Sequence, residues 1–182
     1  MDPIYENGVA VPGTGAAPAA AAVRAARPGD LEAVLGIRND AVKNSTALWT
    51  ETPLTTAEGA AWFAAYLERG AAFVAEYAGE VVGFAVYGPW RALEGYRHSA
   101  ENSVYVRTDR HGLGIGSALL TVLVPAARQA GYHVMIADIE AGNAASIRLH
   151  ERFGFETVGT VREVGIKFGR WLDLTIMRLP LD

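Results

Sequence analysis

The run Arg110-His-Gly-Leu-Gly-Ile-Gly-Ser117 places Gly112, Gly114 and Gly116 directly before a segment whose apolar residues recur at helical spacing. A glycine has no Cβ atom, so a ligand can approach its main chain closely, and it tolerates positive φ. The N–H groups of a first helical turn are unpaired and lie at the positive end of the helix dipole. Together these features form a binding site for an anion, most often a pyrophosphate group.

Two well-known glycine loops that bind nucleotides make further demands on the neighbouring residues. A P-loop requires Gly-x-x-x-x-Gly-Lys-Ser/Thr, and no lysine follows Gly116. A dinucleotide-binding loop requires Gly-x-Gly-x-x-Gly near the start of its domain, with an acidic residue about 20 positions on. Here Asp138 fits that acidic position, but position 117 is serine and the run lies late in the chain. A tight turn without a ligand would explain one or two of the glycines, and it remains an alternative interpretation.

Four stretches in the expected order resemble GNAT-type N-acetyltransferases. The family's acetyl-CoA loop, Arg/Gln-x-x-Gly-x-Gly/Ala, resembles His111-Gly-Leu-Gly-Ile-Gly-Ser-Ala-Leu-Leu, with histidine in the Arg/Gln place. A second family signature resembles Asn143-Ala-Ala-Ser-Ile-Arg-Leu-His-Glu-Arg-Phe-Gly-Phe155. Two further stretches resemble segments of the phosphinothricin and methionine-sulfoximine acetyltransferases. They are Gly88-Pro-Trp-Arg…Tyr-Arg-His-Ser-Ala-Glu-Asn-Ser-Val-Tyr-Val106 and Val164-Gly-Ile-Lys-Phe-Gly-Arg-Trp-Leu-Asp173. The resemblance begins near Val23, and it implies an α/β fold of the GNAT type, with a mixed central sheet flanked by about four helices.

The resemblance implies that acetyl-CoA is the co-substrate. The residues expected to bind it are Val104, Tyr105, Val106, His111, Gly112, Leu113, Gly114, Ile115, Gly116, Ser117, Asn143 and Ser146. Asn143 would contact the pantetheine arm, whereas Ser146 would bond to that arm or cap the following helix, and capping is the better-supported role. We expect no metal site, because the four histidines show no ligand spacing and the chain has no cysteine.

Two residues are candidates for proton transfer. Glu101 precedes the cofactor loop, and a carboxylate there could accept the proton that an amine must lose before it attacks a carbonyl carbon. The resemblance places the subfamily's catalytic glutamate on Glu101, although a solvated acid at a strand end is the alternative. His150 stands where many family members have a tyrosine that protonates the departing thiolate. It could donate that proton, or it could pack on a helix face or contact the cofactor without proton transfer.

The stretch before Glu101 is rich in arginine and aromatic residues. Arg91 and Arg97 could hold a carboxylate, phosphinate or sulfoximine group, and Tyr96 could form an aromatic wall. Trp49 could complete the same pocket or pack in the core. We expect these four residues to bind a small amine substrate, while surface roles for the arginines stay open.

Length and composition exclude several classes of protein. With 182 residues, 51% hydrophobic and 20% charged, the chain is expected to form one globular domain with a sizeable core. A net charge of −4 without a basic run argues against nucleic acid as a partner. No apolar run reaches the roughly 18 residues of a membrane span. The absence of cysteine excludes a cysteinyl intermediate and agrees with a cytoplasmic location.

Patterns along the chain predict an α/β order of elements around these residues. Residues 1–22 are rich in alanine, proline and glycine and predict a flexible extension before a domain over 23–182. Strands are predicted over 22–26, 72–77, 81–87, 102–107, 134–139, 157–164 and 172–179. Helices are predicted over 31–43 with Asp30 as N-cap, from a Thr55 capping box to Gly70, from the glycine run to about 130, and over 144–153 with Gly154 ending it.

The function that these features favour is acetyl transfer from acetyl-CoA to the primary amine of a small amino-acid-like substrate. Without an evident nucleophile on the protein, direct attack in a ternary complex is the simpler mechanism. Two alternatives stay open, namely acetylation of protein N-termini or lysines and a CoA-binding sensor without turnover. The resemblance also implies a homodimer.

Overall fold

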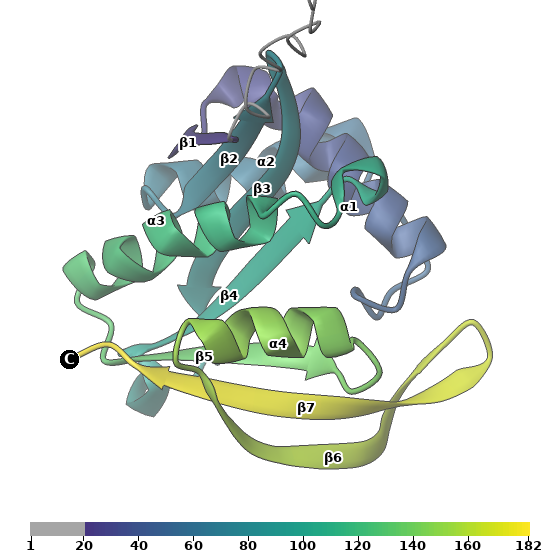
Figure 1. Cartoon of the computed structure of the whole chain (residues 1–182), viewed down its shortest axis with the longest axis vertical. Helices are drawn as coiled ribbons and strands as arrows, with labels where there is room; N and C mark the ends of the chain where they lie inside the picture. Colours follow the sequence, from purple (N-terminus) through teal and green to yellow (C-terminus); the bar gives the residue numbers. More distant parts are fainter. Residues whose placement is uncertain (1–20) are drawn as a thin grey trace, which may run out of the picture.

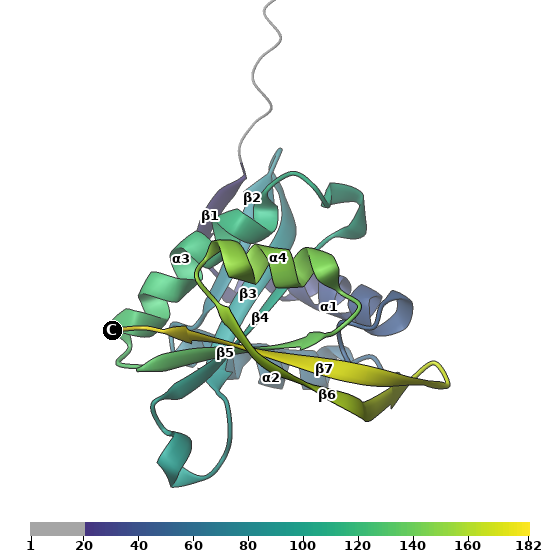
Figure 2. The same ribbon diagram turned by 60° about the horizontal axis from the view of Figure 1, so that its bottom comes forward.

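The computed structural model describes residues 21–182 as a seven-stranded sheet with four α-helices (Figures 1 and 2). The helices are α1 Leu31–Asn44, α2 Thr56–Glu68, α3 Ile115–Gln129 and α4 Ala144–Arg152. The strands are β1 Ala22–Ala25, β2 Ala72–Tyr77, β3 Glu80–Pro89, β4 Ser99–Val106, β5 Val134–Glu140, β6 Glu156–Lys167 and β7 Arg170–Pro180. The predicted α/β class with a mixed sheet and four helices is confirmed.

The sheet opens in its middle, between β4 and β5. Its order is β1-β2-β3-β4-β5-β7-β6, and within it β4 and β5 are the one parallel pair. Their ladder holds three residue pairs and ends at Glu101 and Ile136, although β4 continues to Val106. Beyond that point the two strands diverge (Figure 1). The edge of β4 that faces β5 therefore has main-chain groups without a strand partner, next to a gap in the sheet.

Each face of the sheet has its own hydrophobic core. On one face, helix α3 contributes Leu119 and Leu123, which pack with Met135 of β5. On the other face, α1 and α2 contribute Val34 and Phe63, which pack against β2 and β3. Because side chains alternate along a strand, β4 sends Val104 to the α3 face and Tyr105 to the α1 face.

Three predicted helix ends are confirmed in position, and one of them lacks the expected side-chain bond. The Thr55 and Glu58 side chains form the expected capping box at the start of α2. Gly154 has a φ of +85° just after α4, as a C′ glycine requires. Asp30 is the N-cap residue of α1, as predicted, but its side chain forms no hydrogen bond to the helix. Its carboxylate instead accepts hydrogen bonds from the Arg24 guanidinium of β1 and from the Arg27 main-chain N–H.

Strand boundaries differ from the predicted ones near the site and at the C-terminus. β4 begins at Ser99, three residues earlier than predicted, so Glu101 lies inside the strand rather than before it. β6 and β7 are longer than predicted and pair as one hairpin. The predicted extension over 1–22 lies outside the described residues except for its last two. Within residues 21–182, no helix has the length and apolarity that crossing a membrane requires.

Candidate active site

A cleft of about 440 Å³ lies between the glycine run and helix α4, and we term it the cofactor cleft. Gly112 and Gly114 have φ values of +80° and +76°, and no neighbouring atom lies within 4 Å of the position of a Cβ on either. Their main chain is therefore open to a ligand. Gly114 is the N-cap of α3, so the unpaired N–H groups of the first helical turn belong to residues that line this cleft.

The residues around the loop hold it in this shape. A Cβ on Gly116 would lie 2.9 Å from Leu149 Cδ2, so a larger residue here would displace the end of this α4 side chain. The His111 Nε2–H donates to Val106 O at 3.0 Å, since a carbonyl can only accept. The histidine side chain thus fastens the loop to the end of β4.

Three arginines that were not predicted also line the cofactor cleft: Arg110, Arg148 and Arg152. Arg148 and Arg152 are four residues apart on α4, and this spacing places them on one helix face. Guanidinium groups bind phosphate oxygens well. The spacing can be seen in the sequence, but it predicts phosphate binding only once α4 is known to face the glycine run.

Most of the predicted cofactor-binding residues line the cleft, and two do not. Tyr105 and Leu113 are the exceptions. The alternation of β4 turns Tyr105 to the α1 face, where its ring lies 5.1 Å from that of Phe84. The Leu113 side chain is 53% exposed at the tip of the loop.

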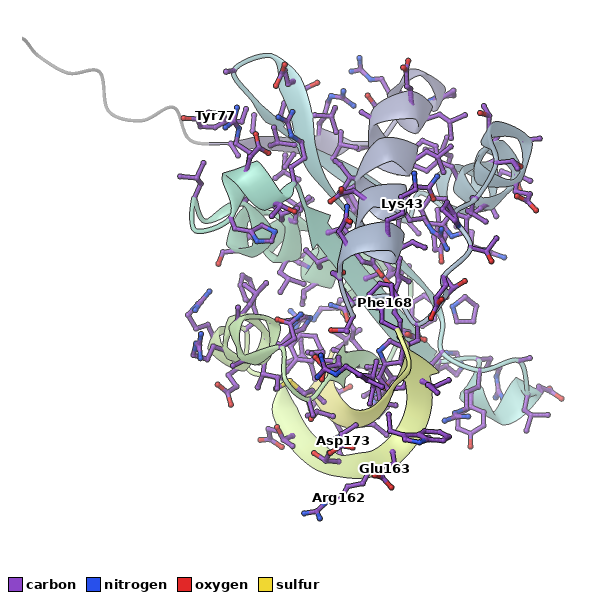
Figure 3. The ribbon with its side chains drawn as sticks, turned by 90° about the vertical axis from the view of Figure 1, so that its right-hand side faces the viewer. Lys43, Tyr77, Arg162, Glu163, Phe168 and Asp173 are labelled. Carbon is purple, nitrogen blue, oxygen red and sulfur yellow. The ribbon has the colours of Figure 1, made fainter. Side chains whose placement is uncertain are left out.

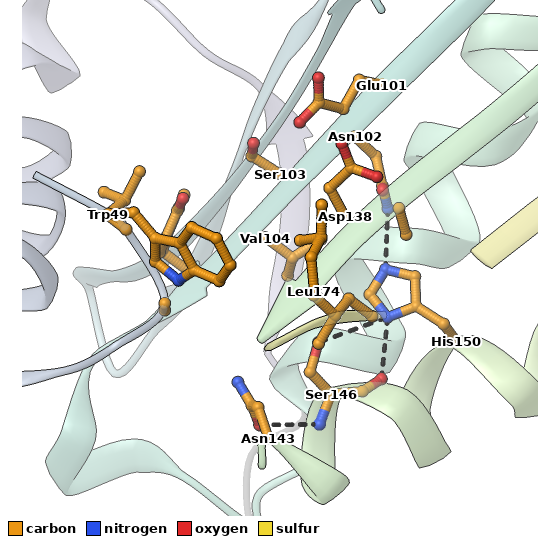
Figure 4. A pocket seen from close by; sticks show the side chains of 15 residues that line it. Trp49, Glu101, Asn102, Ser103, Val104, Asp138, Asn143, Ser146, His150 and Leu174 are labelled. Atoms are coloured by element: carbon orange, nitrogen blue, oxygen red, sulfur yellow. Dashed lines mark hydrogen bonds between the residues drawn. The ribbon is translucent and has the colours of Figure 1, made fainter. Parts of the chain in front are cut away.

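A second hollow of about 320 Å³, termed the acceptor cavity, passes through the gap between β4 and β5 (Figure 4). From the α1 face it is lined by Glu101 and Asp138, and from the α4 side by His150. The loop between α1 and α2 supplies Trp49 as a further wall. The acceptor cavity and the cofactor cleft share Val104, Asn143 and Ser146, so the two hollows meet at the gap.

Glu101 is poised to exchange a proton near neutral pH. Burial raises the pKa of Glu101 to about 7, the nearby charge of Asp138 contributes to this rise, and Arg91 opposes both. Burial also raises the pKa of Asp138, whereas the hydrogen bond from Trp90 and the charge of Arg91 lower it. A base is most effective when its pKa lies close to the working pH. The position and the electrostatics of Glu101 thus suit a general base, and that role stays a prediction.

His150 is buried, 4% exposed, with both ring nitrogens engaged. Its Nδ1–H donates to Ser146 O at 2.8 Å, since a carbonyl cannot donate. Its Nε2 then has no hydrogen and accepts from Asn102 Nδ2 at 2.9 Å. Burial lowers the pKa of His150. The lowered pKa favours the neutral ring, and this arrangement leaves no ring N–H free for a departing thiolate.

The capping role expected of Ser146 is wrong, because Asn143 performs it. Asn143 is the N-cap of α4, and its Oδ1 accepts from the Ser146 N–H at 3.1 Å. Both residues still line the two hollows.

The predicted substrate-binding residues fall into two groups. Trp49 lines the acceptor cavity, and the charge of Arg91 acts on Glu101 and Asp138 while its guanidinium stacks on Trp90 at 4.5 Å. Tyr96 packs edge-on against Trp90 at 5.4 Å. Arg97 is exposed, and its Nη1 donates to Glu94 O at 3.4 Å. Of the four predicted residues, only Trp49 is therefore part of the cavity lining, and Arg91 acts on the cavity through its charge alone.

The β6–β7 hairpin holds the loop that carries Trp49. Lys167 is 1% exposed, and its Nζ donates to the main-chain oxygens of Ser45 and Leu48 at 2.6 and 2.5 Å. The Phe168 N–H donates to the Glu51 carboxylate at 2.9 Å, at the hairpin end that lies below α1 in Figure 3. The Trp49 ring packs so closely on Gly165 that no Cβ would fit there. This fastening was not predicted, because the partners are more than 100 positions apart.

Within the described part of the chain, no group of three or more metal-ligating side chains is found. The chemistry of both hollows is instead that of carboxylates, amides and main-chain N–H groups.

Comparison with known proteins places the chain in a family. Residues 34–155 match the acetyltransferase (GNAT) family. The L-methionine sulfoximine/L-methionine sulfone acetyltransferase of Pseudomonas paraeruginosa is 53% identical, over 89% of this chain and 95% of that protein. A crystal structure of ribosomal-protein-alanine N-acetyltransferase from Brucella melitensis is 50% identical, with a TM-score of 0.85 over 87% of this chain and 99% of that one.

A third relative was solved with acetyl-CoA bound. It is the GNAT superfamily phosphinothricin acetyltransferase of Sinorhizobium meliloti, which is 36% identical, with a TM-score of 0.85 over 89% of both chains. The family resemblance seen in the sequence is therefore confirmed, and so is the fold that it implied. The chain belongs to the acetyltransferase (GNAT) family and is an N-acetyltransferase.

Proposed function

We propose that this protein transfers the acetyl group of acetyl-CoA to the α-amine of small amino acids of the methionine sulfoximine and phosphinothricin type. One observation carries the proposal. A cleft built from main-chain N–H groups and arginines meets a cavity built from carboxylates at a single gap in the sheet. Two reactants can therefore enter from opposite faces and touch there. The names of the relatives support the same substrate class.

The cofactor cleft fits acetyl-CoA. The open main chain at Gly112 and Gly114 and the first turn of α3 would hold the pyrophosphate, with the nearby arginines adding positive charge. Residues 102–106 of β4 pair with β3 on one side only. Their other edge, which faces β5, would bond to the amides of the pantetheine arm. Acetyl-CoA supplies an activated carbonyl carbon, which this placement puts at the gap.

In the acceptor cavity, Glu101 would take a proton from the amine, which then attacks the carbonyl carbon directly. The chain has no cysteine, so an acyl-cysteine intermediate is excluded. His150 would act by holding Asn102 and the start of α4 in place rather than by protonating the thiolate. The proximity of the two reactants would supply much of the rate.

A second candidate function, acetylation of a protein N-terminus, is favoured by the name of the Brucella melitensis relative. A panel of amines with acetyl-CoA separates the two, with release of free CoA as the readout. We expect methionine sulfoximine and phosphinothricin to exceed an alanine-starting peptide in kcat/KM. Equal or higher activity on the peptide would favour the second candidate.

Arginine variants add a matched pair to that panel. Arg91→Ala should impair amino acids more than a simple alkylamine, since Arg91 acts on the cavity through its charge, whereas Arg97→Ala should change little. Equal losses of activity in both variants would mean that the two arginines contribute alike to substrate binding.

We also propose that residues 23–182 form the catalytic domain and that the protein works as a cytoplasmic homodimer. The support for a dimer is a set of exposed apolar side chains on the β6–β7 hairpin: Val158, Val161, Val164, Ile166 and Trp171. Sedimentation of the full chain measures the oligomeric state directly.

A further inference from the structure

Two buried oxygens of the acceptor cavity have no hydrogen-bond partner. They are Asp138 Oδ1 and Asn102 Oδ1, and among residues 21–182 only four buried side-chain atoms are unpaired in this way. Asn102 is 6% exposed, and its amide nitrogen is already used by His150. The Asn102 oxygen can only accept hydrogen bonds, and so can the Asp138 oxygen when the carboxyl is ionised. The cavity is therefore suited to a ligand that donates hydrogen bonds.

Asp138 lies beside Glu101 for a simple topological reason. The parallel ladder pairs Glu101 with Ile136, and Asp138 comes two residues later on β5, so both carboxylates lie on the same face of the sheet. Both line the acceptor cavity (Figure 4). The other oxygen of Asp138 accepts only a long bond, 3.5 Å, from Trp90 Nε1.

The charge in the cavity is unbalanced. Within the described residues, neither Glu101 nor Asp138 forms an ion pair. The titratable groups around them are Arg91 after β3, Tyr66 of α2, Tyr105 of β4 and His150 of α4. Arg91 acts from a distance while it stacks on Trp90. Buried carboxylates without a cation are unfavourable, so a ligand that brings a positive charge gains where an uncharged one does not.

We infer that Asp138 is a specificity-determining residue that binds the substrate's ammonium group, with Asn102 Oδ1 as a second acceptor and Glu101 as the group that takes the proton. This inference rests on the proposed function. An amino acid carries its amine as an ammonium at neutral pH, so the enzyme would bind the abundant protonated form. Of the two protons that the nitrogen loses, one passes to Glu101 and then to solvent, and the other ends on the released thiol of CoA.

The test combines a variant with a substrate analogue. Asp138→Asn keeps the shape of the side chain and removes its charge, and the deamino analogue of methionine sulfoximine keeps the rest of the ligand and removes the ammonium. Binding of both compounds to wild type and variant is measured by calorimetry at pH 7 with CoA present. We expect the variant to weaken methionine sulfoximine by about tenfold to a hundredfold, the range for one charge-assisted hydrogen bond, and the deamino analogue by less than about twofold.

Controls separate this role from a structural one. Glu140→Gln changes the next acid on the same face of β5, whose carboxylate bonds to Gly142 N and Thr46, and should leave both affinities unchanged. Asp138→Glu retains the charge and should keep the preference for the amine, which also covers a failure of Asp138→Asn to fold. Equal weakening of both compounds in Asp138→Asn would overturn the inference. If the wild-type protein binds no amino acid, the proposed function is rejected rather than the role of Asp138. That role is then tested by measuring binding of the alanine-starting peptide to wild type and Asp138→Asn.

Discussion

The cofactor cleft and the acceptor cavity are built on different principles. The cleft comes mainly from one continuous stretch, and its working groups are main-chain N–H groups exposed by glycines. The cavity comes from four separate elements and the α1–α2 loop, and its working groups are side chains with shifted pKa values. Substitutions in the cleft should therefore act through backbone shape, whereas those in the cavity should act through charge.

The largest effect expected from this contrast is that of Glu101→Gln. The volume of the side chain is kept and the base is lost, so kcat should fall by about 10²–10⁴-fold, the usual contribution of a general base. Burial raises the pKa of Glu101 to about 7, so wild-type kcat/KM should rise up to that pH as the carboxyl loses its proton. The variant should lack this rise and bind acetyl-CoA normally. Wild-type turnover at neutral pH would remove Glu101 as the base.

Gly114→Val tests the opposite half of the contrast. A β-branched residue at a φ of +76° is strained, and its Cβ occupies the open main chain, so the Kd for acetyl-CoA should rise about tenfold or more. Gly79→Val is the matched control, because Gly79 has a φ of +83° and equally open surroundings in the β2–β3 turn. Similar losses of affinity in both variants would attribute the effect to strain alone rather than to the cleft.

The smallest effect is expected at the wall of the cavity that carries Trp49. Lys167→Met removes the two hydrogen bonds that fasten this loop, so KM for the amine should rise about threefold to tenfold while the Kd for acetyl-CoA stays constant. Arg162→Met, on the same strand, is the control and should change neither constant. An equal change in both constants would mean that Lys167 supports the whole fold rather than one wall of the cavity.

The sequence predicted the cofactor cleft better than the cavity, for a physical reason. Glycines before a helix are a local signal, and the loop geometry at Gly112 and Gly114 follows from it. Asp138 could have been noticed as a polar residue in an apolar strand, but its place beside Glu101 depends on where the β4–β5 ladder ends. That end point is a property of the whole sheet.

Local rules also failed where two candidates competed for one role. Asn143 and Ser146 are both good N-caps, and the start of α4 decides between them. Asp30 occupies the N-cap position of α1, but its carboxylate pairs with Arg24 instead of a helix N–H. Arg91 and Arg97 have the same chemistry, but Arg91 is the arginine whose charge acts on Glu101 and Asp138, which the sequence alone does not reveal.

The raised pKa of Glu101 also has a consequence for folding. In the unfolded chain this carboxyl loses its proton near its usual value of 4.5, whereas in the folded chain it keeps the proton up to about 7. Between those values the folded state binds more protons, so this group lowers the free energy of unfolding as the pH rises through that window, and the loss persists above it. A bound cation would offset the loss, because any ligand that binds only the folded state stabilises it. The substrate should thus protect the protein from thermal unfolding more at pH 8 than at pH 5.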